Sequence, residues 1–144
     1  MISGVLVTPL NIIDTPGGNV MHAMKESDEG YSGFGEAYFS KVHLGSIKAW
    51  KRHKEMILNL VVPIGKIRFV LFDDRIGQVK EFQEIILSNN NYSRLTVPPM
   101  IWMGFQGLHY NESILLNIAN IKHSQEESET RNIEEIEFNW EIDK

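Results

Sequence analysis

Short apolar runs alternate with turn-forming residues along most of the chain. Residues 56–63 form an apolar run suited to a buried strand, and residues 66–72 form another after a short turn. Residues 14–18 read Asp-Thr-Pro-Gly-Gly, a combination that favours a tight turn. Further strands are predicted at residues 5–7, 19–24, 36–43, 47–53, 94–97, 102–107 and 113–118.

The remaining segments are less regular. The apolar residues of 81–87 also fit a helical period, but the short length and the neighbouring strands favour a strand. Residues 25–35 are predicted as a loop, and the acidic residues 124–135 are expected to hold a short helix. Residues 136–140 alternate apolar and polar and should dock their apolar side at the end of the fold. About nine or ten short strands predict an all-β jelly roll or related barrel with a short peripheral helix.

Composition narrows the class of protein. A chain of 144 residues is expected to form one domain, residues 1–144, and 42% hydrophobic with 23% charged residues is ordinary for a soluble protein. The absence of Cys excludes disulfides and thiolate-bound metals. A net charge of −5 argues against general nucleic-acid binding, although a local basic pocket stays open. Without a membrane-length apolar run or signal-peptide pattern, we expect a cytoplasmic protein that binds no membrane.

The most distinctive pattern lies between Gly45 and Gly65. Gly45 is followed after five residues by Lys51-x-His53, after four more by Leu58, and after six more by Gly65. This spacing resembles a motif of the cupin superfamily, which reads Gly, five residues, His-x-His, about four residues, Glu, six residues, Gly. The resemblance implies a cupin-type jelly-roll β-barrel with a central pocket.

The ligands of the cupin metal are largely missing from this pattern. The second cupin motif, Pro-x-Gly, two residues, His, resembles residues 98–103, where Met103 stands at the His position. Lys51 and Leu58 occupy two further ligand positions, so only His53 could bind a divalent ion. Because a transition metal requires three or four N, O or S donors, we expect neither a metal nor another cofactor.

His53 is instead predicted to belong to a cationic pocket. Lys51 and His53 lie two residues apart and therefore share one face of a strand. Lys41 and His43 of the neighbouring strand would add positive charge, as a site for an anionic substrate or an enolate requires. An exposed edge strand, in which Lys residues discourage aggregation, is the alternative. In the absence of a bulge, the opposite face of the strand carries Lys48, Trp50 and Arg52.

Longer stretches resemble one branch of the cupins. Residues 50–55 read Trp-Lys-Arg-His-Lys-Glu, and residues 59–70 and 97–105 follow in matching order. Together they resemble the dTDP-4-dehydrorhamnose 3,5-epimerase family, a metal-free branch that has Arg-Gly-Leu-His-Tyr-Gln at the first position and processes nucleotide-linked 4-keto sugars. Residues 52–56 and 99–102 carry a looser likeness to the sugar 3,4-ketoisomerases.

This resemblance implies roles for several positions. A His of the family abstracts the proton next to the C4 ketone, and His53 matches it. The family's proton-donating Tyr corresponds to Leu116, its enolate-supporting Lys to Asn59, and the Arg three residues before the His to Trp50. The Asp that pairs with the family's His lies near or beyond the point where this sequence stops.

Other residues would have to supply the missing groups. A neutral His suits proton abstraction near working pH, and Lys51, Lys48 or Arg52 could stabilise an enolate. Tyr110 or Tyr38 could replace the acid, although a surface or core Tyr is the alternative for each. The predicted catalytic residues are His53, Lys51 and Tyr110, and the predicted substrate-binding residues are Lys41, His43, Lys48, Trp50, Arg52, Asn59 and Trp102.

Three functions follow from these observations. The first is a cofactor-free epimerase or isomerase of a nucleotide-linked 4-keto sugar, in surface-polysaccharide or deoxysugar biosynthesis, with the nucleotide sugar as its partner. The second is a non-catalytic cupin that binds a nucleotide sugar or carbohydrate, and the third is a sugar 3,4-ketoisomerase. The resemblance further implies a homodimer with strands contributed across the interface.

Overall fold

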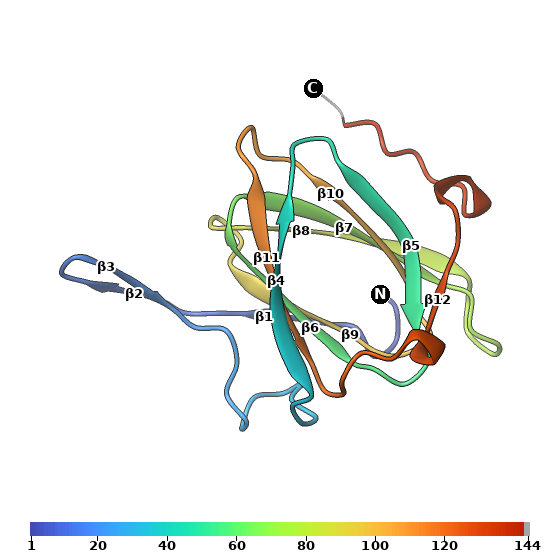
Figure 1. The fold of residues 1–144 in the computed structure, drawn as a ribbon, viewed down its shortest axis with the longest axis horizontal. Coiled ribbons are helices and arrows are strands. Elements are labelled where there is room, and N and C mark those ends of the chain that lie inside the picture. The colour runs from blue at the N-terminus through green and yellow to red at the C-terminus, as the bar shows by residue number, and fades with distance from the viewer. Residues whose placement is uncertain (143–144) are drawn as a thin grey trace.

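Two antiparallel five-stranded sheets face each other in the computed structural model, which describes residues 1–142 (Figure 1). The first sheet has the order β1 (Leu6–Pro9), β9 (Ser93–Val97), β6 (Leu58–Ile64), β11 (Ser113–Ala119) and β4 (Glu36–Val42). The second sheet has the order β12 (Ser128–Thr130), β5 (Ile47–His53), β10 (Trp102–Gly107), β7 (Lys66–Asp73) and β8 (Glu81–Ser88). The predicted all-β jelly-roll fold is confirmed, and the ambiguous segment 81–87 is a strand.

The main core lies between the two sheets. Leu58, Leu60 and Val62 alternate along β6 and point inward, where each is almost completely buried. They belong to the same apolar cluster as Phe69 and Leu71 of β7. Each such side chain contributes about 1.5–3 kcal/mol through burial, so the alternation along these strands both selects and stabilises the sandwich.

A second apolar cluster covers the outer face of the second sheet. Ile136, Phe138 and Trp140 follow the last strand and pack against Trp50 and Trp102. The predicted docking of residues 136–140 is therefore confirmed. The acidic stretch before them differs from expectation, because it holds two 3₁₀ helices with strand β12 between them. These helices are η1 (Gln125–Glu127) and η2 (Ile133–Glu135).

A β-hairpin projects from the barrel beside the first sheet (Figure 1). It consists of β2 (Ile12–Thr15) and β3 (Gly18–Met21), which are joined by the predicted turn and pair only with each other as a two-stranded sheet. Within residues 1–142, no helix has the length and apolar character needed to cross a bilayer.

Candidate active site

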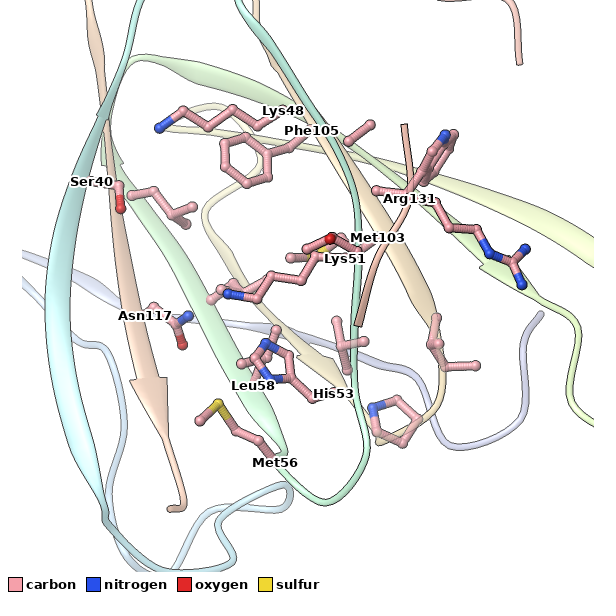
Figure 2. A pocket seen from close by; sticks show the side chains of 18 of the residues that line it. Ser40, Lys48, Lys51, His53, Met56, Leu58, Met103, Phe105, Asn117 and Arg131 are labelled. Atoms are coloured by element: carbon pink, nitrogen blue, oxygen red, sulfur yellow. The ribbon is translucent and has the colours of Figure 1, made fainter. Parts of the chain in front are cut away.

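A cavity of about 360 Å³ lies between the two sheets, within the range of about 300–1,000 Å³ usual for small-molecule sites (Figure 2). Its walls come from β4, β6, β9 and β11 of the first sheet and from β5, β10 and β12 of the second. Apolar side chains such as Leu58, Leu60 and Phe105 form much of the wall. The polar and charged lining residues are Tyr38, Ser40, Lys48, Lys51, His53, Asn117, Thr130 and Arg131.

A bulge in β5 decides which of its lysines line the cavity. Lys51 pairs with Met103 on β10, but Lys48 pairs with Phe105, so β5 has one more residue than β10 in this interval. The extra residue reverses the alternation, and Lys48 joins Lys51 and His53 along the cavity (Figure 2). The expectation that Lys48 lies on the opposite face is wrong for this reason.

His53 is held by a buried carboxylate. Its Nδ1 lies 2.5 Å from Oε1 of Glu127, and both side chains are almost completely buried. The other carboxylate oxygen, Oε2, accepts hydrogen bonds from the backbone N–H groups of Glu55 at 3.0 Å and Met56 at 2.8 Å. Burial raises the pKa of Glu127, but the hydrogen bonds from His53 and the two backbone groups outweigh it, so the pKa lies below its ordinary value of 4.5.

This pairing selects the chemistry available to His53. An ionised Glu127 only accepts hydrogen bonds, so His53 donates through Nδ1–H, and in the neutral imidazole the lone pair is on Nε2. Nε2 is thus the basic nitrogen of a ring that lines the cavity. An imidazolium formed there would be stabilised by the adjacent negative charge. The arrangement is that of a general base with an orienting carboxylate.

Tyr38 and Asn117 form a second polar pair on the wall contributed by the first sheet. The two residues lie opposite each other on β4 and β11, and Asn117 Nδ2 donates a hydrogen bond to the Tyr38 hydroxyl at 2.9 Å. Burial raises the pKa of the Tyr38 phenol above its ordinary value of 10.0, and the hydrogen bond from Asn117 opposes this shift only in part. Tyr38 therefore keeps its proton across the physiological range and is available as an acid.

Comparison with known proteins shows which family this chain belongs to. No family model matches the sequence. The structure superposes on the dTDP sugar isomerase from Desulfovibrio desulfuricans G20 with a TM-score of 0.93 and 34% identity, over 96% of this chain and 92% of that one. This chain belongs to the family of that dTDP sugar isomerase.

Two more distant proteins also resemble this chain. A probable low-salt glycan biosynthesis epimerase from Haloferax volcanii is 27% identical over 100 residues, which span 67% of this chain and 64% of that protein. The match thus covers less than two thirds of that relative. The dTDP-4-dehydrorhamnose 3,5-epimerase from Bacillus anthracis has a TM-score of 0.83 over 99% of this chain and 87% of that one, and its 18% identity indicates a shared fold.

Glu127 is a candidate functional residue that the sequence did not predict. The carboxylate that pairs with the family's His was expected near or beyond the end of the sequence. In the structure, β12 pairs with β5 so that Ser128 lies opposite His53, and this places Glu127 beside the imidazole. The acidic segment 124–135 was the only available signal, since no local spacing joins residue 127 to residue 53.

Tyr110 lies away from the cavity, contrary to its predicted catalytic role. It is 78% exposed in the turn between β10 and β11, where its ring stacks on His109 at a centroid distance of 4.5 Å. Tyr38, which was considered as the alternative acid, is the tyrosine that lines the cavity.

Three predicted binding residues lie on the outer faces of the sheets. Asn59 is buried beneath a loop, where it accepts a hydrogen bond from Thr96 at 2.6 Å. Arg52 forms an ion pair with Glu129 at 2.6 Å, and its guanidinium lies 4.6 Å from the centre of the Trp102 ring. The prediction that Asn59, Arg52 and Trp102 line the pocket is therefore corrected, because each is held by hydrogen-bond, ion-pair or packing contacts outside it.

The other predicted binding residues differ in position. Trp50 borders the cavity, but its ring packs on Trp140 at 5.4 Å on the outer side of the second sheet. Lys41 and His43 are exposed and pair with Glu112, with Lys41 Nζ at 3.3 Å from its carboxylate. Neither Lys41 nor His43 lines the cavity, so the structure does not bring them to His53 as predicted.

The four positions of the cupin metal motif do converge on the cavity. Lys51, His53, Leu58 and Met103 all line it, as the spacing predicts. One imidazole beside an amine and two apolar side chains does not fit a transition metal, which requires three or four donors of suitable geometry. Within residues 1–142, no group of three or more His, Asp or Glu side chains is arranged to hold an ion.

Proposed function

We propose that this protein is an isomerase that transfers a proton next to the ketone of a nucleotide-linked 4-keto sugar. The observation that carries this proposal is the His53–Glu127 pair, which gives a base facing a cavity that also contains the Lys51 ammonium. Membership of the dTDP-sugar isomerase family supports the same reaction class. The name of the Haloferax volcanii relative supports a place in glycan biosynthesis.

The first half of the reaction is proton abstraction. Nε2 of His53 takes the proton from the carbon beside the ketone, and the electron pair moves onto the carbonyl oxygen to give an enolate. Glu127 stabilises the imidazolium that forms. Lys51, whose amino group points into the cavity in Figure 2, stabilises the negative oxygen.

The second half is the return of a proton to the same carbon. Tyr38 lies on the first sheet and His53 on the second, so the two can approach the substrate from different sides. A proton delivered by Tyr38 inverts the carbon, whereas one returned by His53 restores the original configuration. Leu116 stands at the position of the family's proton-donating tyrosine and cannot act as an acid. We therefore propose Tyr38 for that role.

The nucleotide sugar is proposed to bind to the positively charged side chains of Lys48 and Lys51 in the cavity. Lys48 is exposed and Lys51 is half-buried, and the ion pairs found within residues 1–142 involve neither of them. Lys48 is therefore suited to a diphosphate at the solvent side of the cavity and Lys51 to the sugar oxygen. A Lys48→Gln variant should raise KM more than it lowers kcat.

A homodimer in the cytoplasm remains part of this proposal. Ile12, Ile13 and Val20 of the projecting hairpin are exposed, and an isolated two-stranded hairpin is only marginally stable in water. A second copy of the chain that covers the hairpin would bury these apolar side chains and stabilise the two strands.

Product analysis tests the reaction and separates it from the alternatives. Purified protein is incubated with dTDP- and UDP-linked 4-keto-6-deoxyhexoses, and the products are identified by NMR spectroscopy. An epimer with the ketone still at C4 supports the proposal. A 3-keto product would assign the protein to the sugar 3,4-ketoisomerases, and binding without turnover across the panel would leave a non-catalytic nucleotide-sugar-binding cupin.

A further inference from the structure

Asn117 has an unsatisfied polar atom buried in the cavity wall. Its side chain is only 7% exposed, lies on the inward face of β11 and points into the cavity (Figure 2). The Nδ2 group is engaged by the Tyr38 hydroxyl, but Oδ1 has no hydrogen-bond partner among residues 1–142. A buried carbonyl oxygen without a partner is costly, and in native proteins it commonly marks a position that another group fills.

The apolar neighbours of Asn117 give that oxygen no hydrogen-bond partner. Leu115 precedes it on the inward face of β11, and Leu58 and Leu60 of the adjacent strand β6 also line the cavity, so these neighbours offer no donor. The contact with Tyr38 has a further consequence. Because Nδ2 donates to the phenol oxygen, the phenol proton is free to point away from Asn117. The pair therefore presents one donor, the Tyr38 hydroxyl, and one acceptor, Asn117 Oδ1.

We propose that Asn117 positions Tyr38 and determines which sugar is accepted, by receiving a hydrogen bond from a hydroxyl of the sugar ring on Oδ1. This inference rests on the proposed function. A 4-keto-6-deoxyhexose linked through C1 has hydroxyl groups only at C2 and C3, since C4 is a ketone and C6 a methyl group. One of these two hydroxyls is the donor to Asn117. The contact would hold the ring with its ketone-adjacent carbon between His53 and Tyr38.

Deoxy analogues test the contact with the sugar. The dTDP-linked 4-keto-6-deoxyhexoses that lack the C2 or the C3 hydroxyl are titrated by calorimetry into wild-type protein and Asn117→Leu. The substitution should weaken binding of the analogue that retains the contacted hydroxyl by roughly tenfold and change the other by less than about twofold. The assignment would be overturned if the substitution weakened the binding of both analogues equally, or if it left the binding of both unchanged.

A second variant tests the orientation of Tyr38. In Asn117→Asp, the carboxylate accepts the phenol proton and turns it away from the substrate. Inversion of the sugar should fall at least tenfold while deuterium uptake through His53 persists, and KM should change less than kcat. Parallel loss of uptake and inversion, with an unchanged thermal unfolding midpoint, would contradict the positioning role. Asn139→Asp, at an exposed position, serves as the control variant.

The outcomes separate this inference from the proposed function. If wild-type protein shows no turnover on any substrate, the proposed function fails. The calorimetric comparison would still show whether Asn117 accepts a hydrogen bond from a sugar hydroxyl. If wild-type protein turns over and the Asn117→Leu variant keeps the full preference between the two analogues, only the role of Asn117 is lost.

Discussion

Glu127 is proposed to act on the reaction through the tautomer of His53. Its Oε2 accepts two backbone hydrogen bonds, so in Glu127→Gln the amide oxygen must occupy that position and the NH₂ group must face His53 Nδ1. The ring then carries its proton on Nε2, where it cannot act as a base. Deuterium uptake into the sugar should fall by about 10²-fold or more, measured by NMR spectroscopy. Glu126→Gln at the neighbouring exposed position should retain wild-type rates, and equal rates in both variants would exclude this role.

Tyr38 is distinguished from His53 by which step it serves. Tyr38→Phe removes the proposed acid but leaves the base, so exchange with solvent deuterium should continue while formation of the inverted sugar drops by about 10²–10⁴-fold. Comparison of deuterium content with product configuration in one NMR experiment measures both. Tyr110→Phe is the matched control because Tyr110 lies in an exposed turn. Loss of inversion in Tyr110→Phe but not in Tyr38→Phe would reverse the assignment.

At single residues, local spacing predicts only part of the site. His53 and Lys51 were predicted because two residues on one strand share a face, and both line the cavity. Glu127 and Asn117 were not predicted, because each depends on pairing between strands far apart in sequence. Lys48 was assigned to the wrong face because the bulge in β5 depends on its register with β10, which the sequence of β5 alone does not reveal.

Among the elements, the segment after β12 supports the sheet that carries His53. Ile136 is 5% exposed and packs with Trp50 and Trp102 on the outer face of β5 and β10. Ile136→Ala should lower the free energy of unfolding by about 2–4 kcal/mol through the lost burial and the cavity it leaves, as measured by urea titration. Ile142→Ala, at a half-exposed position, should change it by less than about 0.5 kcal/mol. A similar loss in both variants would show that the segment is not docked as described.

Apolar runs and element length account for most of what could be predicted at this scale. β6 and β7 agree with the predicted apolar runs because much of each strand is buried on both faces, whereas for β8 the short length and the neighbouring strands favoured a strand over a helix. The acidic stretch was less predictable, since its short 3₁₀ helices and β12 form through contacts with β5 rather than through local propensity.

For the whole molecule, the projecting hairpin predicts self-association. Ile13 is 46% exposed on this hairpin, and the proposed second copy would cover it. Light scattering coupled to size-exclusion chromatography should give twice the chain mass for wild-type protein and the single-chain mass for Ile13→Lys. Val79→Lys, in the exposed turn between β7 and β8, should remain dimeric. A monomeric wild type, or a dimer that survives Ile13→Lys, would contradict this arrangement.

The central claim is that His53 removes a proton from the carbon beside a sugar ketone. The most direct measurement is deuterium uptake from D₂O into C3 or C5 of a dTDP-linked 4-keto-6-deoxyhexose, followed by NMR spectroscopy for wild type, His53→Ala and the exposed control His123→Ala. We predict uptake in wild type and His123→Ala and a loss of about 10²–10⁴-fold in His53→Ala. Undiminished uptake in His53→Ala, or no uptake in wild type with a substrate that binds, would contradict the account.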